Sequence, residues 1–230
     1  SGLFGSAPVK NAPWPWAFPE EVGVEHFEGI ASGQVPSPYL VEQLQKAAIH
    51  FASYVLVSPV FFTCSDWDAR TATQKAECGW KSIERFSQRA WRRPLSETER
   101  TRLKSFWDVN FSSSTPEETL VLTAAGILQS PAFLFREEHG DSDQIQGQAM
   151  PLTGWEMASR LSYFLWDSMP DAVLFEAAAK GELATKAGVE TQVRRMLEDP
   201  RARAMVVHFH HQWMGTNRVR GISPARRVYG

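Results

Sequence analysis

The sequence predicts an all-α protein, an irregular multi-helix bundle of about eight helices with an extended N-terminal arm. Three observations lead to this fold class. Apolar residues recur at three- and four-residue intervals in most segments, as they do on one face of a helix. The capping-box pattern, Ser or Thr followed three residues later by Glu, occurs at Ser96, Thr115 and Thr153. No segment alternates apolar and polar residues for long enough to indicate a strand.

Residues 1–36 are expected to form the arm, because they are rich in Pro, Gly and Trp and show no steady period. The first helix follows at SPYLVEQLQKAAIHFASYVL. Ser37 can cap this helix, and Pro38 suits the first helical position, where no backbone N–H is needed. The apolar residues over 40–55 repeat at helical spacing, which predicts one packed face.

Further helices complete a first helical subdomain, which is predicted to span residues 37–139. Apolar residues at helical spacing over 80–90 mark the second helix, and Pro94 breaks it. The next two helices begin at the capping boxes of Ser96 and Thr115.

The polar stretch GDSDQIQGQAM then predicts a flexible connection, which is the expected boundary between two subdomains. A second helical subdomain is predicted over residues 151–215. It contains short helices that end at Gly181 and before Pro200, and a last helix that begins at this proline. Residues 216–230 are expected to form a tail.

Composition excludes several classes of protein. The formal net charge is −2, which argues against a general nucleic-acid or anionic-membrane binder, because such proteins concentrate Lys and Arg. No apolar run reaches the roughly 18 residues of a membrane span. The first residues lack the layout of a signal peptide, so any export signal is expected to have been removed or to lie outside this chain.

The two cysteines, Cys64 and Cys78, are separated by the polar stretch SDWDARTATQKAE, which predicts a surface loop. A disulfide between them would stabilise the fold by about 3 kcal/mol on the loop-entropy model. It would also imply an oxidising compartment. Two free thiols are the alternative, and the spacing fits no zinc-binding pattern.

The stretch VVHFHHQWMG near the C-terminus raises the question of a metal or haem site. On a helical wheel the buried face is predicted to comprise Ala202, Met205, Val206, Phe209 and Trp213. His208 and His211 then point away from this face. They are three positions apart and could share a metal ion, although such a site needs further ligands from elsewhere. A solvated or partner-facing surface is the interpretation that we favour.

Aromatic and basic residues predict a protein interface. The nine tryptophans are interpreted as large anchors in a core or an interface, and Trp14 and Trp16 place two of them in the arm. Arg89, Arg92 and Arg93 could hold a phosphate or stack on a partner, although a helix C-terminus favours cations in any case. The expected interface residues are Trp14, Trp16, Arg92 and Arg93.

Catalysis by this chain alone has little support in the sequence. Asp167 and Asp171 could act as an acid and a base, yet turn and cap roles account for both. There is no nucleophile elbow, phosphate loop or dinucleotide fingerprint. We therefore expect no catalytic residue and no cofactor in this chain.

Five stretches resemble, in order, consecutive segments of a known family. They are FEGIASGQVPSPYLVEQLQKAA, ERFSQRAWRRPLSETE, ILQSPAFLFREE, LTGWEMASRLSYFLWDSMPD and VRRMLEDPRARAMVVHFHHQWMG. The family comprises large exported proteins of planctomycetes and myxobacteria, built from tandem cytochrome-associated domains of unknown function. The resemblance implies a periplasmic or cell-surface location and, in many members, a c-type cytochrome module. Because this chain has no CxxCH, haem is expected only in a partner domain or chain.

The predicted function is a non-catalytic helical scaffold or subunit of an extracytoplasmic assembly, associated with c-type cytochrome electron transfer. The chain is expected to be cut from a longer precursor, and its partners are expected to be sister fragments or other subunits. One alternative is part of an oxidoreductase whose active site is completed by other domains. Another is carbohydrate binding through exposed tryptophans, which a helical protein rarely supports.

Overall fold

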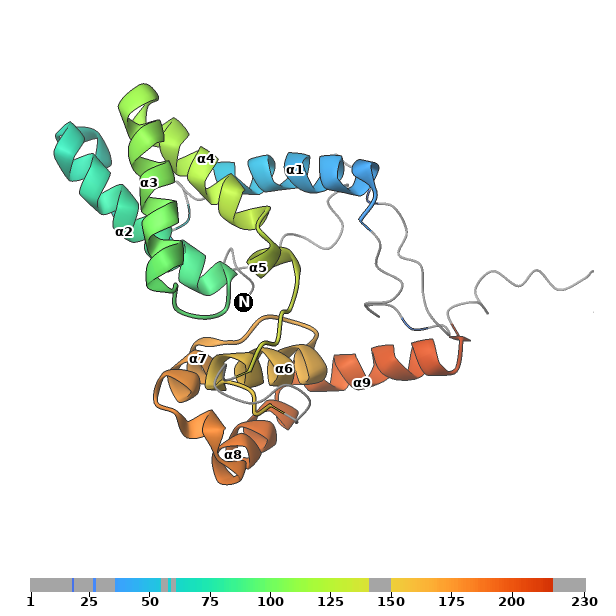
Figure 1. Ribbon diagram of the computed structural model, residues 1–230. Coiled ribbons are helices and arrows are strands. Elements are labelled where there is room, and N and C mark those ends of the chain that lie inside the picture. The colour runs from blue at the N-terminus through green and yellow to red at the C-terminus, as the bar shows by residue number, and fades with distance from the viewer. Residues whose placement is uncertain are drawn as a thin grey trace, which may run out of the picture.

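The computed structural model describes residues 36–54, 61–140 and 150–216, together with Phe18, Phe27 and Ser58. Over these residues the protein is all-α, as predicted, with nine α-helices and no strand (Figure 1). No helix in this part of the chain has the length and apolar character needed to span a membrane. Trp14 and Trp16 lie outside the described residues, as does most of the predicted connection GDSDQIQGQAM.

A first group of five helices packs around one hydrophobic cluster. The helices are α1 (Pro38–Ser53), α2 (Ala72–Ala90), α3 (Glu97–Ser113), α4 (Pro116–Leu128) and α5 (Pro131–Leu134). The apolar helix α4 is the centre of the group and packs against α1, α2 and α3. Phe61, Phe86 and Trp107 are the largest side chains buried in this core.

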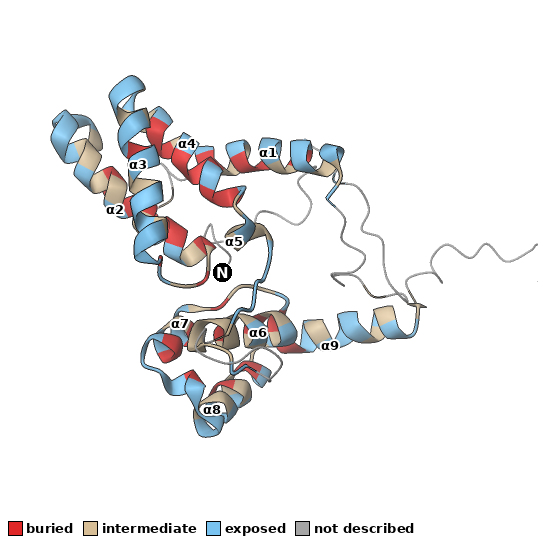
Figure 2. Ribbon diagram, viewed as in Figure 1, coloured by how far each residue is buried: buried red, intermediate tan, exposed pale blue. Residues whose placement is uncertain are grey.

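A second group of four helices has its own hydrophobic cluster. The helices are α6 (Gly154–Trp166), α7 (Ala172–Ala179), α8 (Lys186–Leu197) and α9 (Pro200–Trp213). Leu174 and Met196 are fully buried in it. The groups touch, because Met169, which follows α6, packs against the cluster of the first group. Figure 2 shows buried residues inside both groups.

Helix starts follow the sequence closely. All three predicted capping boxes are present, with the side-chain and backbone hydrogen bonds both formed. A fourth box, formed by Thr71 and Gln74, begins α2. The prediction of a surface loop between the cysteines is therefore wrong for its second half, which forms the first turns of α2. The start of this helix was missed for two reasons. The capping box is closed by glutamine in place of glutamate, and the first turns of α2 are polar, so no apolar residues recur there at helical spacing.

The disulfide predicted between Cys64 and Cys78 is present. Cys64 is buried, and it follows Phe61, which fills the first core. Cys78 belongs to α2. The bond therefore fastens the segment that carries Phe61 to the helix against which that segment packs.

The prediction of a buried face on α9 is wrong beyond the first turn of the helix. Ala202 is buried, but Val206, Phe209 and Trp213 are 53%, 44% and 63% exposed. The helix packs against α6 and α8 near its start and then extends away from the group (Figures 1 and 2). A helical wheel identifies the apolar face correctly, but it carries no information about whether another element covers that face.

Gly79 allows α2 to approach α3 closely. A β-carbon at this position would lie 2.8 Å from Cη2 and 3.0 Å from Cζ2 of Trp107. The Trp107 ring is fully buried and has no room to move. We expect Gly79→Ala to lower the free energy of unfolding by about 1–3 kcal/mol, because overpacking outweighs the better helix propensity of alanine.

Gly126 in α4 provides the matched control, because a β-carbon there meets no neighbouring atom within 4 Å. Gly126→Ala is expected to raise the free energy of unfolding by about 0.5–1 kcal/mol. Urea unfolding of the two variants measures both effects. Equal stability of the two variants would contradict the close approach of Gly79 and Trp107.

Candidate functional site

Arg92 fixes one wall of the region between the two helical groups. It follows the end of α2 in a left-handed conformation, with φ 59°, and its side chain is only 6% exposed. The guanidinium donates four hydrogen bonds to backbone carbonyl oxygens, those of Ala90, Ala132, Phe133 and Phe135. Only Ala90 belongs to α2, so the attraction of a cation to the C-terminus of a helix accounts for one of these four bonds. The other three hold α5 and the residue after it.

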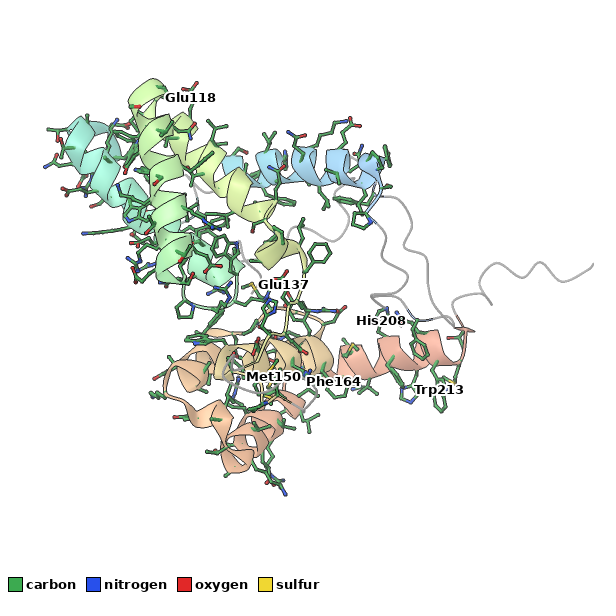
Figure 3. The ribbon with its side chains drawn as sticks, in the orientation of Figure 1. Glu118, Glu137, Met150, Phe164, His208 and Trp213 are labelled. Carbon is green, nitrogen blue, oxygen red and sulfur yellow. A yellow bond between two sulfur atoms is a disulfide. The ribbon has the colours of Figure 1, made fainter. Side chains whose placement is uncertain are left out.

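A cleft of about 1060 Å³ lies between the two groups. The first group contributes the turn after α2 and the segment after α5, and the second contributes residues of α6 and α9. Its lining includes Trp91, Arg93, Arg136, Trp155, Tyr163 and Phe164. In Figure 3, Glu137 lies between the two groups, whereas His208 and Trp213 lie on different sides of α9.

Two of the arginines in the cleft are neutralised by carboxylates. Arg93 forms two hydrogen bonds with Glu99, both 2.7 Å long. These bonds lower the pKa of Glu99 to about 2. Arg160 pairs in the same two-bond manner with Glu138. The predicted interface residue Arg93 is thus engaged within the chain, and its contact with a partner stays a prediction.

Glu156 joins the two walls of the cleft. It is the capping-box carboxylate of α6, and its Oε1 also accepts hydrogen bonds from the backbone N–H groups of His139 and Gly140, at 2.6 and 3.0 Å. Burial alone would raise the pKa of Glu156, but the N–H groups of Thr153 and His139 outweigh burial and lower it. The capping box was visible in the sequence, whereas its bonds to the segment after α5 were not.

Tyr163 brings two further arginines together. The guanidinium of Arg136 lies 4.5 Å from the centre of the Tyr163 ring, and that of Arg92 lies 6.0 Å from it. Among the described residues, no carboxylate forms an ion pair with either arginine. Burial lowers the pKa of Arg92, and the positive charges of Arg136 and Arg93 lower it further against the opposing effect of Tyr163. The sequence did not predict that the two arginines would lie close to one tyrosine ring.

The two histidines predicted as metal ligands have separate partners. Nε2 of His208 lies 3.1 Å from Nε2 of Gln212, and Nδ1 of His211 lies 2.6 Å from Oγ1 of Thr216. His208 lines the cleft and His211 does not. Within the described ranges there is no group of three or more His, Cys, Asp or Glu side chains that could hold a metal ion. Metal binding by this pair stays a prediction.

The carboxylates Asp167 and Asp171 take the turn and cap roles that the sequence allowed. Asp171 caps α7 and accepts two hydrogen bonds from Arg195, at 2.8 and 3.1 Å. Burial raises the pKa of Asp171, but Arg195 and the backbone N–H of Leu174 lower it overall. Asp167 ends α6 in a left-handed conformation, with φ 48°.

Comparison with known proteins finds two families along the chain. Residues 78–138 match a family described as Protein of unknown function (DUF1595), and residues 152–230 match one described as Protein of unknown function (DUF1592). The chain therefore carries two tandem domains of unknown function, as the resemblance implied. Both domains line the cleft. No curated protein and no solved structure matches the chain significantly.

Proposed function

We propose that this chain is a non-catalytic helical subunit of an extracytoplasmic protein assembly, and that it binds its partner through α9. The exposed apolar face of α9 carries the proposal, because each of its side chains keeps a large part of its surface accessible. This face is defined by Val206, Phe209 and Trp213, which recur at three- and four-residue intervals and so lie on one stripe of the helix. A continuous apolar stripe that remains exposed is typical of a protein–protein interface.

Contacts on the α9 face indicate what binds there. The ring of Phe27 stacks on Phe209 with 5.8 Å between ring centres, and Phe209 stacks on Trp213 with 6.2 Å between centres. The face thus already accepts an aromatic side chain from the segment that precedes the first helix. Because the chain holds two domains in tandem, we take the partner to be another domain of the same precursor, which would present a similar aromatic segment.

The cellular location and the cytochrome association extend the proposal. The Cys64–Cys78 disulfide supports an oxidising compartment, since such bonds persist mainly outside the cytoplasm. The association with a c-type cytochrome, with haem in a partner chain, stays a prediction of the family resemblance. No described residue bears on it.

The test is cross-linking mass spectrometry on the native assembly with Trp213→Glu. The matched control is Val109→Glu on α3, because Val109 is likewise exposed and apolar. We expect cross-links between α9 and another domain of the precursor in the wild type and in Val109→Glu. Trp213→Glu should lose them, because a charge placed in an apolar interface is costly to bury.

Thermal unfolding of both variants should match the wild type, since neither side chain is buried. Retention of the partner by Trp213→Glu would contradict the proposal. Cross-links that join α9 only to a second copy of this chain would replace the proposed partner by self-association.

A further inference from the structure

We propose that the cleft between the two helical groups is a binding site for a monocarboxylate, with Arg136, which lies against the ring of Tyr163, as the residue that receives it. Residues of α9, including Phe209, line one side of this cleft, but the inference rests on Arg136 and Tyr163 and does not depend on the proposed function. It rests on the balance of charge in the cleft, on the chemistry of its walls and on its size.

The charges in the cleft are unevenly compensated. Arg93 and Arg160 each have a carboxylate partner in Glu99 and Glu138. Arg92 has none: its four terminal N–H groups are occupied by backbone carbonyls, which are neutral. Its positive charge is therefore satisfied by hydrogen bonds but is not neutralised.

Arg136 adds a second uncompensated charge next to the first. Its side chain is exposed, it lines the cleft, and its described contact is with the ring of Tyr163. Two guanidinium groups that share one tyrosine ring repel each other, and an anion between them and solvent would relieve that repulsion. Because the terminal N–H groups of Arg92 are taken, Arg136 is the group that can donate to the anion, and its planar fork fits a carboxylate.

The remaining charges select for a single negative charge. Glu137, Glu156 and Asp167 also line the cleft, so a bound anion meets negative charges there as well as the arginine pair. A phosphate dianion would meet more repulsion here than a carboxylate, which carries one charge. The chemistry of the walls therefore favours a monocarboxylate.

The walls also indicate the body of the ligand. The cleft is lined by large aromatic side chains from both groups, including Trp91, Phe135, Trp155 and Phe164, the last of which is 72% exposed. Its volume, about 1060 Å³, is sufficient for a small organic molecule. A carboxylate attached to an aromatic or apolar body would place its charge at Arg136 and its body against these rings.

The carboxylate could belong to a free organic acid or to the side chain or C-terminus of a partner chain. Both present the same chemistry to Arg136. A ligand of either kind would contact both tandem domains at once, because the cleft is built from both.

The first experiment titrates the full chain with benzoate, and with benzamide as its neutral counterpart, followed by tryptophan fluorescence or saturation-transfer NMR. We expect benzoate to bind saturably and benzamide to bind about tenfold more weakly or worse, since a charge-assisted hydrogen bond is lost. Arg136→Gln should weaken benzoate by about tenfold or more and remove the preference over benzamide. Arg136→Lys keeps the charge and should retain part of the affinity.

Arg203→Gln is the matched control, because Arg203 is an exposed arginine on α9 outside the cleft. It should bind benzoate like the wild type. Unchanged thermal midpoints verify that each variant is folded. The proposal is overturned if benzoate does not bind saturably, if benzamide binds equally well, or if Arg136→Gln keeps full affinity. Tighter, Arg136-dependent binding of inorganic phosphate would overturn the choice of carboxylate.

A second measurement separates the two sources of the carboxylate. If Arg136→Gln lowers the amount of partner cross-linked in the native assembly, the group belongs to the partner chain. If the assembly is unchanged and denaturation releases an organic acid from wild type but not from Arg136→Gln, the ligand is a free molecule. Trp213 does not line the cleft, so the result of the benzoate titration stands apart from that of Trp213→Glu.

Discussion

Arg92→Met will lower the free energy of unfolding by about 3 kcal/mol, which is among the largest effects expected of a single substitution in this chain. The variant leaves the carbonyl oxygens of Ala90, Ala132, Phe133 and Phe135 without their donor. A buried polar group without a partner costs about 1–3 kcal/mol, and relief from desolvating the guanidinium offsets only part of the combined loss. Urea denaturation at neutral pH measures the difference.

Two further variants separate the causes of that loss. Arg92→Lys keeps the charge but has only three donors and no planar fork, so its stability should fall between the wild type and Arg92→Met. Arg85→Met removes an exposed arginine from α2 and should have little effect. The left-handed backbone at position 92 affects Arg, Lys and Met alike, so strain cancels from the comparison. A loss of less than about 1 kcal/mol in Arg92→Met would contradict the role of this residue in holding α5.

Removing the disulfide by the double substitution Cys64→Ala, Cys78→Ala will also destabilise the protein by about 3 kcal/mol. The two cysteines are 14 positions apart, and in the loop-entropy model the loss of this cross-link enlarges the unfolded ensemble. The native fold loses a tether as well, because the bond fastens the segment that carries the buried Phe61 to α2.

Reduction of the wild type with dithiothreitol provides the internal check on this prediction. The reduced wild type should approach the stability of the double variant, and the double variant should not respond to the reductant. A double variant that is as stable as the oxidised wild type would show that the cross-link contributes nothing to folding.

Local sequence predicted the helices well, because the signals that begin and end a helix act within a few residues. Thr115 and its glutamate three positions later form a capping box whatever the rest of the chain does. Gly181 takes the left-handed conformation expected after a helix end. The start of α2, between Cys64 and Cys78, was missed. Its capping box is closed by Gln74, whereas the pattern that predicted the other boxes ends in glutamate.

The candidate site was largely hidden from the sequence, because its contacts join residues far apart in the chain. Arg92 looked like a cation at a helix end, and only the packed structure brings the carbonyls around Phe133 to it. Tyr163 carried no signal in the sequence, yet its ring lies close to two arginines of the other domain. No spacing pattern encodes such contacts.

The sequence by itself determined that this chain folds into helices and where most of them begin, whereas it left open whether its two cysteines form a bridge. Tertiary structure alone decided which apolar faces are covered, since the apolar stripe of α9 is buried only near the start of the helix, where α6 and α8 pack against it. It also decided where charge remains uncompensated. Periodicity and capping depend on neighbours within a turn of the chain, whereas burial and charge balance depend on residues that only the fold brings together.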